Sequence, residues 1–399
     1  MLASIILVAF VTVSFGAKVP LTMLSDPKAK CLDGTQAGYY AQSASNPVNK
    51  NKWVIYLNGG GECDTYDACW YQTSNALGSS KYFSSEVDAS GWFLGSDYCT
   101  YNPTFCEWNH VYDPYCTQDL HAGQVTEVND ENFGLYFAGH HVFTAMLDAL
   151  DKPTSDRASM LDAEEIILTG ASAGGIGVWM NLDYLAHRYP KAKVSGMTIA
   201  GHYFYATYYD GPNHTNPGGM GDFRESAWSN TYKLYNAYVD ESCKAAYERR
   251  GESAGACLLS NNSLPFIESD VFVVQAKTDS VVLTGHDCWP ESNMYDEPEQ
   301  AFMQQWSQNM SIALEPLMKL EEEKVLKNGP RRGVFAVSCY THTGFNHAYP
   351  LLNGQNFYSV FSKFYFNNNA LYNSTIASSE YKLQDTCGLM CNPTCSGRQ

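Results

Sequence analysis

The segment EEIILTGASAGGIGVWMNLDYLAHRY, residues 164–189, decides the fold. Its apolar, β-branched run at residues 166–169 is typical of a buried strand. From residue 178 to 185 the apolar side chains recur at helical spacing, which predicts a helix. Between them, Gly170-Ala171-Ser172-Ala173-Gly174 matches G-x-S-x-G in the strand–turn–helix context that exposes a serine nucleophile.

The glycines of this motif have a structural reason. A turn sharp enough to lift one serine above the edge of a sheet leaves no room for Cβ atoms two residues away on either side. The following helix directs its first N–H groups toward the serine, where a developing oxyanion needs donors. The alternative is a glycine-rich turn with an incidental serine, and the flanking strand and helix argue against it. We therefore predict that Ser172 is a nucleophile.

A second glycine-rich turn follows the strand predicted at residues 53–57. Its sequence, Asn58-Gly59-Gly60-Gly61, allows backbone N–H groups to face a substrate oxygen, as in the oxyanion hole of α/β-hydrolases. An ordinary flexible turn is the alternative. A phosphate-binding loop would need a G-K-[ST] ending, which this turn lacks.

Two later strands, predicted at residues 271–277 and 333–340, are each followed by a residue that can assist a serine. Asp279 lies two residues past the first strand and His342 two residues past the second. Loops at the carboxyl ends of parallel strands converge on one site, and Ser, Asp, His is the chain order of α/β-hydrolases. Because serine needs a base, and the base needs a carboxylate to orient it, we predict a triad of Ser172, Asp279 and His342.

Other residues compete for the same roles. His347 also follows the last strand and is the main rival base, whereas His286 is only seven residues beyond Asp279, with no strand between them. Asp287 is an alternative acid. Asp270 precedes its strand and so belongs to the opposite end of the sheet.

Length and composition fit one large α/β domain or two smaller ones. The chain has 399 residues, of which 45% are hydrophobic, enough for a large core. We interpret residues 1–17 as a signal peptide, cut near Gly16 or Ala17, with a buried N-terminal strand as the alternative. Residues 18–399 are then a single esterase domain, and the aromatic, glycine-rich stretch that begins at residue 201 predicts a lid or cap insertion over residues 201–264.

Cysteines and sequons agree on an extracellular location. Thirteen cysteines fit an oxidising compartment, and their odd number leaves one thiol free. The regular Cys387-x3-Cys391-x3-Cys395 run lacks the close pairs of a zinc site, so we expect disulfides and no metal. N-glycosylation sequons begin at Asn213, Asn261, Asn309 and Asn373.

Charge and hydropathy limit the partners. The formal net charge of −17 argues against binding to nucleic acid or anionic lipid. After residue 17 no apolar run is long enough to span a bilayer, so we expect no stable membrane insertion.

Three further segments have recognisable local patterns. We interpret residues 63–116 as a disulfide-braced loop region, residues 136–150 as an amphipathic helix, and the stretch around Tyr39-Tyr40 as an edge strand or hairpin. His140-His141 then lies at the helix start, where two polar residues are a better interpretation than metal ligands.

With these motifs described, the chain resembles the pectin acetylesterase family, which includes plant pectin acetylesterases and Notum-like carboxylesterases. The resemblance covers most of the chain after the signal peptide. The motifs that carry it are Tyr56-Leu57-Asn58-Gly59-Gly60-Gly61-Glu62-Cys63 with Cys69, Trp108-Asn109-His110-Val111 with Tyr115-Cys116, Tyr136-Phe137-Ala138-Gly139, Gly170-Ala171-Ser172-Ala173-Gly174-Gly175, and Ser338-Cys339-Tyr340-Thr341-His342.

The resemblance implies an α/β-hydrolase fold with a mostly parallel sheet flanked by helices, and no cofactor. It places the triad on Ser172, Asp279 and His342, and the oxyanion donors on Gly60, Gly61 and Ala173. We also expect a Cys63–Cys69 disulfide that holds the glycine loop in place.

The chain departs from the family pattern near the predicted pocket. The family commonly has an aromatic residue where Glu62 stands, and arginine where His110 and Ala138 stand. An aspartate is usual shortly after the strand that ends near Ala200, where this chain has His202-Tyr203-Phe204. The triad chemistry therefore transfers more safely than the substrate.

We expect a secreted, glycosylated, monomeric serine carboxylesterase that removes acetyl groups from a polysaccharide, in the cell wall or at a surface. One alternative is a Notum-like hydrolase that removes a fatty acyl ester from a protein. A catalytically inactive glycan-binding protein is the other, and the intact Ser, Asp and His set disfavours it.

Overall fold

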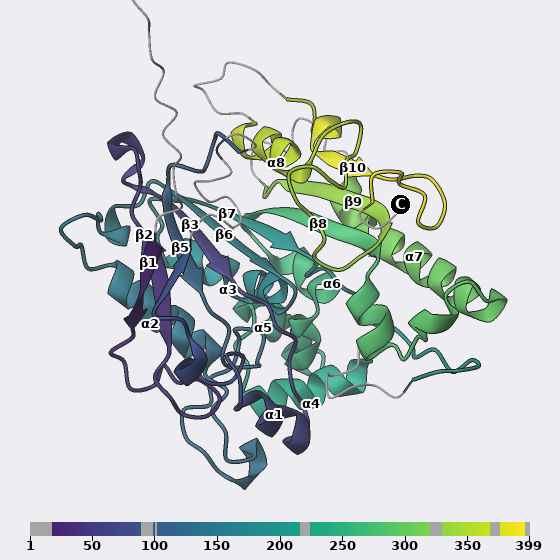
Figure 1. The fold of residues 1–399 in the computed structure, drawn as a ribbon, viewed down its shortest axis with the longest axis horizontal. Helices are drawn as coiled ribbons and strands as arrows, with labels where there is room; N and C mark the ends of the chain where they lie inside the picture. The colour runs from purple at the N-terminus through teal and green to yellow at the C-terminus, as the bar shows by residue number, and fades with distance from the viewer. Residues whose placement is uncertain are drawn as a thin grey trace, which may run out of the picture.

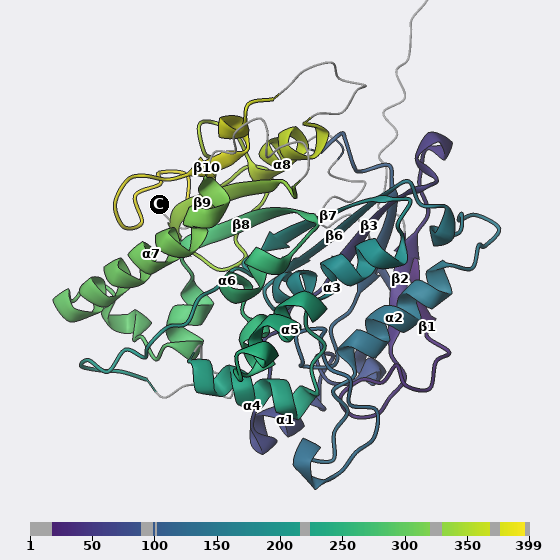
Figure 2. The same cartoon turned by 180° about the vertical axis from the view of Figure 1, so that it is seen from behind.

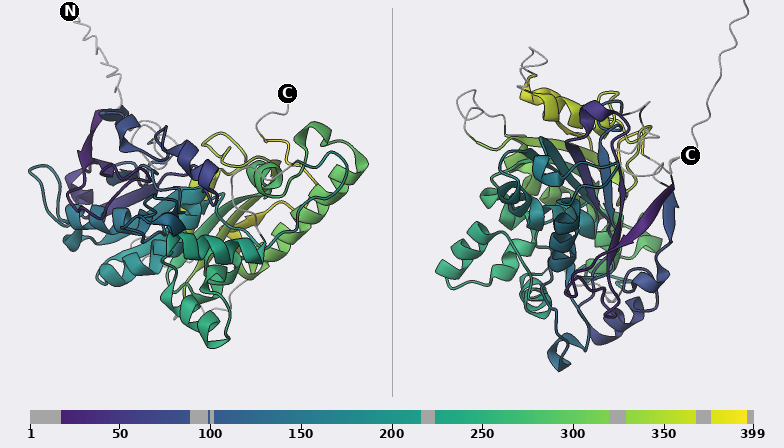
Figure 3. Two further views of the ribbon diagram at one scale, coloured as in Figure 1. Left: turned by 90° about the horizontal axis from the view of Figure 1, so that it is seen from below. Right: turned by 90° about the vertical axis from the view of Figure 1, so that its left-hand side faces the viewer.

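The computed structural model describes residues 18–88, 99, 102–215, 224–319, 329–367 and 376–395. The predicted signal peptide and the sequon at Asn373 lie outside these residues. A ten-stranded sheet, in the order β10-β9-β8-β7-β6-β3-β5-β2-β1-β4, organises the described chain (Figure 1). From left to right in the first view of Figure 3, the chain runs from its purple N-terminal strands to its green C-terminal half.

The strands are β1 (Lys18–Met23), β2 (Gly38–Gln42), β3 (Lys52–Leu57), β4 (Glu86–Asp88), β5 (Asn109–Asp113), β6 (Glu165–Ala171), β7 (Lys193–Ile199), β8 (Asp270–Thr278), β9 (Arg332–Tyr340) and β10 (Lys382–Gln384). The helices are α1 (Tyr66–Gln72), α2 (Gly139–Leu150), α3 (Ala173–Arg188), α4 (Glu225–Tyr235), α5 (Glu241–Arg249), α6 (Ser260–Ser263), α7 (Glu297–Met318) and α8 (Phe357–Phe366).

Seven neighbouring strands, from β10 to β5, run parallel, and β2, β1 and β4 add an antiparallel edge. The register of the central strands decides where the loops meet. Leu57 at the end of β3 pairs with Gly170 of β6, and Ala171 pairs with Ile199 at the end of β7. The glycine loop after β3 and the serine turn after β6 therefore leave the sheet side by side.

The parallel strands are apolar on both faces, because helices cover both sides. Ile166 and Leu168 of β6 join the core formed with α2, α3 and α7, whereas Ile167 between them joins the core under α8. This alternation is the two-residue period of a strand. Figure 2 shows α2, α3 and α5 in front of the sheet. The mostly parallel sheet with flanking helices confirms the predicted α/β-hydrolase-like fold class.

The N-terminal third confirms one expectation in part and corrects another. The stretch around Tyr39-Tyr40 forms β2, which pairs antiparallel with β1 and so makes the predicted hairpin, whereas the edge-strand alternative is wrong because β1 and β4 lie outside β2. The region 63–116, expected to be loop, contains α1 and the internal strand β5. The polar residues of β5 hide its pattern. Asn109, for example, is buried because its side-chain amide donates to the carbonyl oxygens of Lys50 and Lys52, both at 2.8 Å.

Disulfides account for all but one cysteine. Six bridges join Cys31–Cys116, Cys63–Cys69, Cys99–Cys106, Cys243–Cys257, Cys339–Cys395 and Cys387–Cys391, and Cys288 is the one described cysteine that forms no disulfide. The predicted Cys63–Cys69 bridge and the expectation that one cysteine stays outside the disulfides are confirmed. None of the helices in the described ranges is long and apolar enough to span a membrane.

The segment predicted to be a lid, residues 201–264, connects β7 to β8 and contributes α4, α5 and α6. It is fastened to the domain at several points. Tyr235 at the end of α4 donates its hydroxyl hydrogen to Cys63 O at 2.7 Å, and Tyr238 N–H donates to Ala122 O at 2.6 Å. Its action as a lid stays a prediction.

Candidate active site

Ser172 occupies the turn between β6 and α3, in the backbone conformation expected for an exposed nucleophile. Its φ of 59° and ψ of −127° lie outside the regions that side chains favour. The turn is held because Ser172 N–H donates to Ile199 O at 2.9 Å. A Cβ atom on Gly174 would collide with the carbonyl oxygen of Leu57, so only glycine fits at that position.

Asp279 and His342, each following a strand, lie in direct contact. His342 Nδ1 is 2.9 Å from Asp279 Oδ1 and 2.8 Å from Oδ2. The carboxylate is fully buried, and the N–H groups of Val281 and Val282 donate to its Oδ1 at 3.0 and 3.1 Å. The Tyr203 hydroxyl lies 3.1 Å from Oδ2. These contacts fix both the carboxylate and the imidazole ring that it orients.

The second nitrogen of His342 is left without a partner. His342 Nε2 is buried and has no hydrogen-bond partner among the described residues, Ser172 Oγ included. His342 and Ser172 line one cavity of about 180 Å³. Catalytic hydrogen bonds are often long before substrate binds, so this arrangement suits a base that takes the serine proton as the ester arrives.

The competing residues have other partners or positions. Asp270 is ion-paired with Arg331 at the amino end of β8, and Asp287 accepts a hydrogen bond from Trp306 Nε1 at 2.8 Å. His347 is absent from the lining of the serine cavity. His286 does line it, and its Nδ1 lies 3.7 Å from Glu62 Oε1.

The glycine loop is held from behind by two side chains. Gln118 Nε2 donates to Gly60 O at 3.1 Å, and His121 Nε2 lies 2.8 Å from Asn58 O. In a trans peptide the carbonyl and the following N–H point in opposite directions. The hydrogen bond from Gln118 therefore turns the N–H of Gly61 away from Gln118. Gly61 and Ala173 both line the serine cavity.

A buried polar cluster lies behind this loop. His121 stacks on Tyr115 at 4.7 Å, and its Nδ1 lies 3.6 Å from Asp113 Oδ2. Burial alone would lower the pKa of His121, but the hydrogen bond and charge of Asp113 outweigh it, so the pKa is raised. Burial raises the pKa of Asp119, whose Oδ2 accepts from Gly139 N–H at 2.7 Å. No motif or periodicity in residues 113–121 points to this cluster.

Glu62 makes one wall of the serine cavity polar. Its side chain is 7% exposed, and burial, followed by the charge of Asp64, raises its pKa to about 8. Glu62 is therefore mostly protonated at neutral pH. The buried ring of His286 lies beside it, and Ile176, Val281 and Val282 supply apolar lining.

Some of the positions at which this chain departs from the family pattern line this cavity, and others do not. Glu62 and Tyr203 line it, whereas His110, Ala138 and His202 do not. His110 Nε2 lies 3.1 Å from Phe105 O, and His202 Nε2 lies 3.2 Å from Ala313 O. Burial lowers the pKa of each to about 4, so both imidazoles are neutral packing groups.

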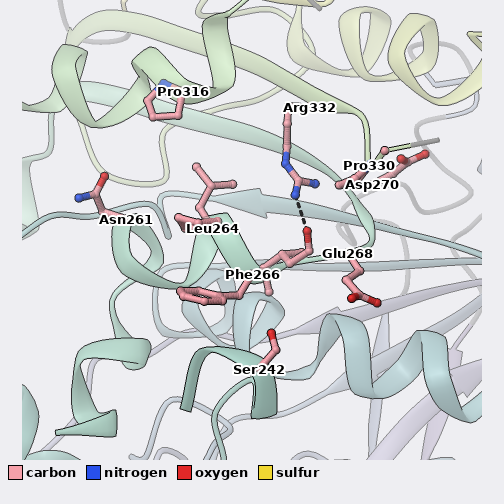
Figure 4. Close-up of a pocket in the computed structure, with 12 residues that line it drawn as sticks. Ser242, Asn261, Leu264, Phe266, Glu268, Asp270, Pro316, Pro330 and Arg332 are labelled. Carbon is pink, nitrogen blue, oxygen red and sulfur yellow. Dashed lines mark hydrogen bonds between the residues drawn. The ribbon is translucent and has the colours of Figure 1, made fainter. Parts of the chain in front are cut away.

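A much larger cleft, of about 960 Å³, lies at the opposite end of the sheet (Figure 4). Asp270 and Arg332, the first residues of β8 and β9, line it together with Ser242 and Phe266. The sequon residue Asn261 also borders this cleft and is half-buried. Asn213 is exposed and Asn309 half-buried. Within the described ranges, His, Cys, Asp and Glu form no group arranged to hold a metal ion.

Comparisons with known proteins agree with this geometry. Residues 13–396 match the model of the Pectinacetylesterase family. Palmitoleoyl-protein carboxylesterase NOTUM of Schmidtea mediterranea is 28% identical over 334 residues, which cover 82% of this chain and 58% of that protein. Pectin acetylesterase 4 of Arabidopsis thaliana is 31% identical over 265 residues, or 66% of this chain and 58% of the relative. The chain thus spans little more than half the length of these two relatives.

Pectin acetylesterase 7 of Arabidopsis thaliana matches over more of its length, at 25% identity, with 85% of this chain and 83% of the relative covered. Among solved structures, the Wnt deacylase Notum from Drosophila superposes with a TM-score of 0.74 at 20% identity. That superposition covers 95% of this chain and 100% of the other, and it establishes the shared fold.

Proposed function

Because the chain belongs to the pectinacetylesterase family, we propose that it is a secreted serine carboxylesterase that removes short acyl groups, above all acetyl, from a polysaccharide. The observation that carries the proposal is the Asp279–His342 pair, in which His342 has an unpartnered Nε2 and lines the same cavity as Ser172. A fixed carboxylate and a histidine with one open nitrogen are what a serine nucleophile requires.

The reaction proceeds through an acyl-enzyme. Ser172 Oγ bonds to the ester carbonyl carbon while its proton passes to His342 Nε2, and Asp279 stabilises the resulting imidazolium. The tetrahedral intermediate collapses by breaking the bond to the sugar oxygen, which leaves with the proton from His342. Water, deprotonated by His342, then attacks the acyl-serine and releases the carboxylic acid and free Ser172.

Backbone N–H groups stabilise the oxyanion of both tetrahedral intermediates. We assign this role to Ala173, at the N-terminus of α3, and to the glycine loop at Gly60 and Gly61. The hydrogen bond from Gln118 to Gly60 O supports the assignment for Gly61, because it sets the plane of the peptide that carries the Gly61 N–H.

The size and polarity of the cavity favour a short acyl group. At about 180 Å³ it is smaller than the roughly 300–1,000 Å³ of pockets that enclose drug-sized ligands. An alkyl chain would also have to pack against the polar side chains of Glu62 and His286, which offer it little apolar surface to replace the water it leaves. The alternative, removal of a fatty acyl ester from a protein, is supported by the similarity to NOTUM of Schmidtea mediterranea.

Secretion, glycosylation and domain organisation belong to the same proposal. The six disulfides support export to an oxidising compartment, with residues 1–17 as the signal peptide and 18–399 as one domain. The sequons at Asn213, Asn261, Asn309 and Asn373 would carry the glycans, and residues 201–264 would act as a lid.

A series of p-nitrophenyl esters tests the activity and the acyl size together. We expect kcat/KM to be highest for acetate and to fall through butyrate to octanoate, with all turnover lost in Ser172→Ala. Faster turnover of octanoate than of acetate would contradict the acetylesterase proposal and favour the lipid-ester alternative.

The charge of the polymer gives a second test. Because the protein has a net charge of −17, it repels polyanionic acetylated pectin, so kcat/KM on pectin should rise with salt concentration. The kcat/KM on neutral acetylated xylan should change little.

A further inference from the structure

A groove of about 500 Å³ lies beside the loop that follows the catalytic glycines. Asp64 and Phe133 form one side of it, and α4 forms the other, through residues that include Arg224, Asn230 and Lys233. A second hollow of about 330 Å³ shares Glu131, Lys233 and Leu234 with the groove. Together they make a continuous depression along α4.

Two exposed aromatic side chains lie next to Phe133, which lines this groove. Tyr66 and Trp70 are four residues apart on α1, so they share one face of the helix. They are 55% and 43% exposed, and their ring centroids lie 5.9 Å apart. Tyr66 also meets Phe133 edge-on at 6.1 Å, and Trp70 Nε1 donates to Phe133 O at 3.2 Å. These contacts hold two exposed aromatic rings in place, where a ligand in the groove can reach them.

The chemistry of the groove suits sugar rings. The C–H face of a pyranose packs on an aromatic ring, while its hydroxyl edge needs donors and acceptors. Tyr66 and Trp70 offer such rings, and the side chains of Asn230, Ser226 and Lys233 offer the polar contacts. The lining also holds two cations, Arg224 and Lys233, against two carboxylates, so this surface is locally balanced in a protein of charge −17.

The groove is joined to the catalytic loop. Asp64 in the groove is two residues after Glu62 in the serine cavity, a span of at most about 7 Å. Cys63, between them, is bridged to Cys69 of α1 and accepts the hydrogen bond from Tyr235 at the end of α4. The aromatic helix α1, the groove wall α4 and the catalytic loop are therefore joined at Cys63. Figure 1 shows α1 and α4 near each other at the bottom of the view.

We propose that this groove binds the polysaccharide chain next to the acetylated sugar, with Tyr66 and Trp70 as stacking surfaces. The proposal rests on the esterase function and adds to it a polymer-binding site outside the serine cavity. The ligand that we propose for the groove is a glycan. A protein that carries an acyl chain would bind here only if the proposal is wrong.

The test compares polymer and small-ester turnover in Trp70→Ala, Trp70→Phe and Tyr66→Ala. The substrates are acetylated pectin, acetylated xylan and p-nitrophenyl acetate. We expect the polymer-to-small-ester ratio of kcat/KM to fall about 10-fold in each alanine variant and to recover largely in Trp70→Phe. Tyr82→Ala is the matched control, because Tyr82 is 54% exposed, much like Tyr66, but lies in the turn Ser80–Tyr82 and takes no part in the contacts that join Tyr66 and Trp70 to Phe133. There the ratio should stay within about 2-fold.

A binding arm separates this proposal from the esterase function. In a Ser172→Ala background, Trp70→Ala should weaken binding of xylo-oligosaccharides or oligogalacturonides about 10-fold by calorimetry. A fall with only one glycan identifies the glycan class that binds in the groove and supports the proposal. Unchanged ratios and unchanged glycan binding would overturn it, as would a loss confined to an octanoylated peptide. If wild type fails to cleave p-nitrophenyl acetate, the esterase function fails, and the calorimetry alone decides on the groove.

Discussion

The two ends of the central sheet differ in how their polar groups are satisfied. At the amino end, Arg331 Nε donates to Asp270 at 2.8 Å, and its Nη1 donates to the carbonyl oxygens of Phe364 and Asn367. Arg332, which lines the large cleft in Figure 4, donates to Ser269 O at 2.7 Å. At the carboxyl end, His342 Nε2 is buried without a partner.

This difference shows that volume is a poor guide to the chemistry. The amino-end cleft is about 960 Å³ and the serine cavity about 180 Å³. The charges of Arg331 and Asp270 are already neutralised by each other, whereas His342 keeps a nitrogen that can accept a proton from Ser172. Changes at the carboxyl end should therefore affect turnover, and changes at the amino end should affect stability.

The largest effect should come from the proposed triad. Ser172→Ala and His342→Ala should each lower kcat by roughly 10³-fold or more, without additivity, because the residues act as one unit. Asp279→Asn should cost about as much or somewhat less. Steady-state kinetics on p-nitrophenyl acetate provide the measurement. His347→Ala is the control, and loss of activity there with full activity in His342→Ala would show that the wrong histidine was chosen.

A change at the amino end tests the other half of the comparison. Arg331→Met should lower the free energy of unfolding by about 3 kcal/mol, because it leaves the carboxylate of Asp270 without its partner. The kcat/KM of the folded variant should stay near wild type. Chemical denaturation and esterase assays on the same preparation give both values. A large loss of kcat without loss of stability would contradict the division between the two ends.

The oxyanion loop should show an intermediate effect. Gln118→Leu removes the donor to Gly60 O and should lower kcat about 10- to 100-fold with little change in KM, because the Gly61 N–H matters most in the transition state. Gln305→Leu on α7 is the matched control, since its side chain bonds only Asn309 in an exposed pair. An increase in KM alone would mean that Gln118 contributes to substrate binding.

Glu62 should give an effect on stability that builds up gradually with pH. The unfolded chain ionises Glu62 above its ordinary pKa of 4.5, whereas the folded protein keeps the proton up to about pH 8. The folded state therefore binds more protons between these values, so this group lowers stability as pH rises. Glu62→Gln should gain on wild type by about 1 kcal/mol per pH unit from pH 5 to 8. If the free energies of unfolding of wild type and Glu62→Gln changed with pH in parallel, the raised pKa of Glu62 would be contradicted.

The central fold could be predicted because its parallel strands are buried on both faces. Apolar runs such as residues 166–169 and 271–277 are visible without any contact information. The positions of Ser172, Asp279 and His342 followed from the same logic, since each comes directly after such a run. The prediction that these three residues lie near one another required one further rule, that the loops at the carboxyl ends of parallel strands converge.

The remaining parts depended on contacts between distant residues. β5 was missed because Asn109 and His110 are buried through side-chain hydrogen bonds that no periodicity reveals. The support of the glycine loop by Gln118 and His121 was missed for the same reason. The groove beside α4 combines Asp64 and Phe133 with residues more than ninety positions later in the chain. Only tertiary structure brings them together.

Covalent labelling of the nucleophile tests the central claim most directly. A fluorophosphonate reacts with a serine only where a neighbouring base accepts the serine proton. After brief exposure of the intact protein, peptide mass spectrometry should find one adduct, on Ser172. The adduct should be absent in Ser172→Ala and much slower to form in His342→Ala. An adduct on a different serine, or equal labelling of His342→Ala and wild type, would contradict the account.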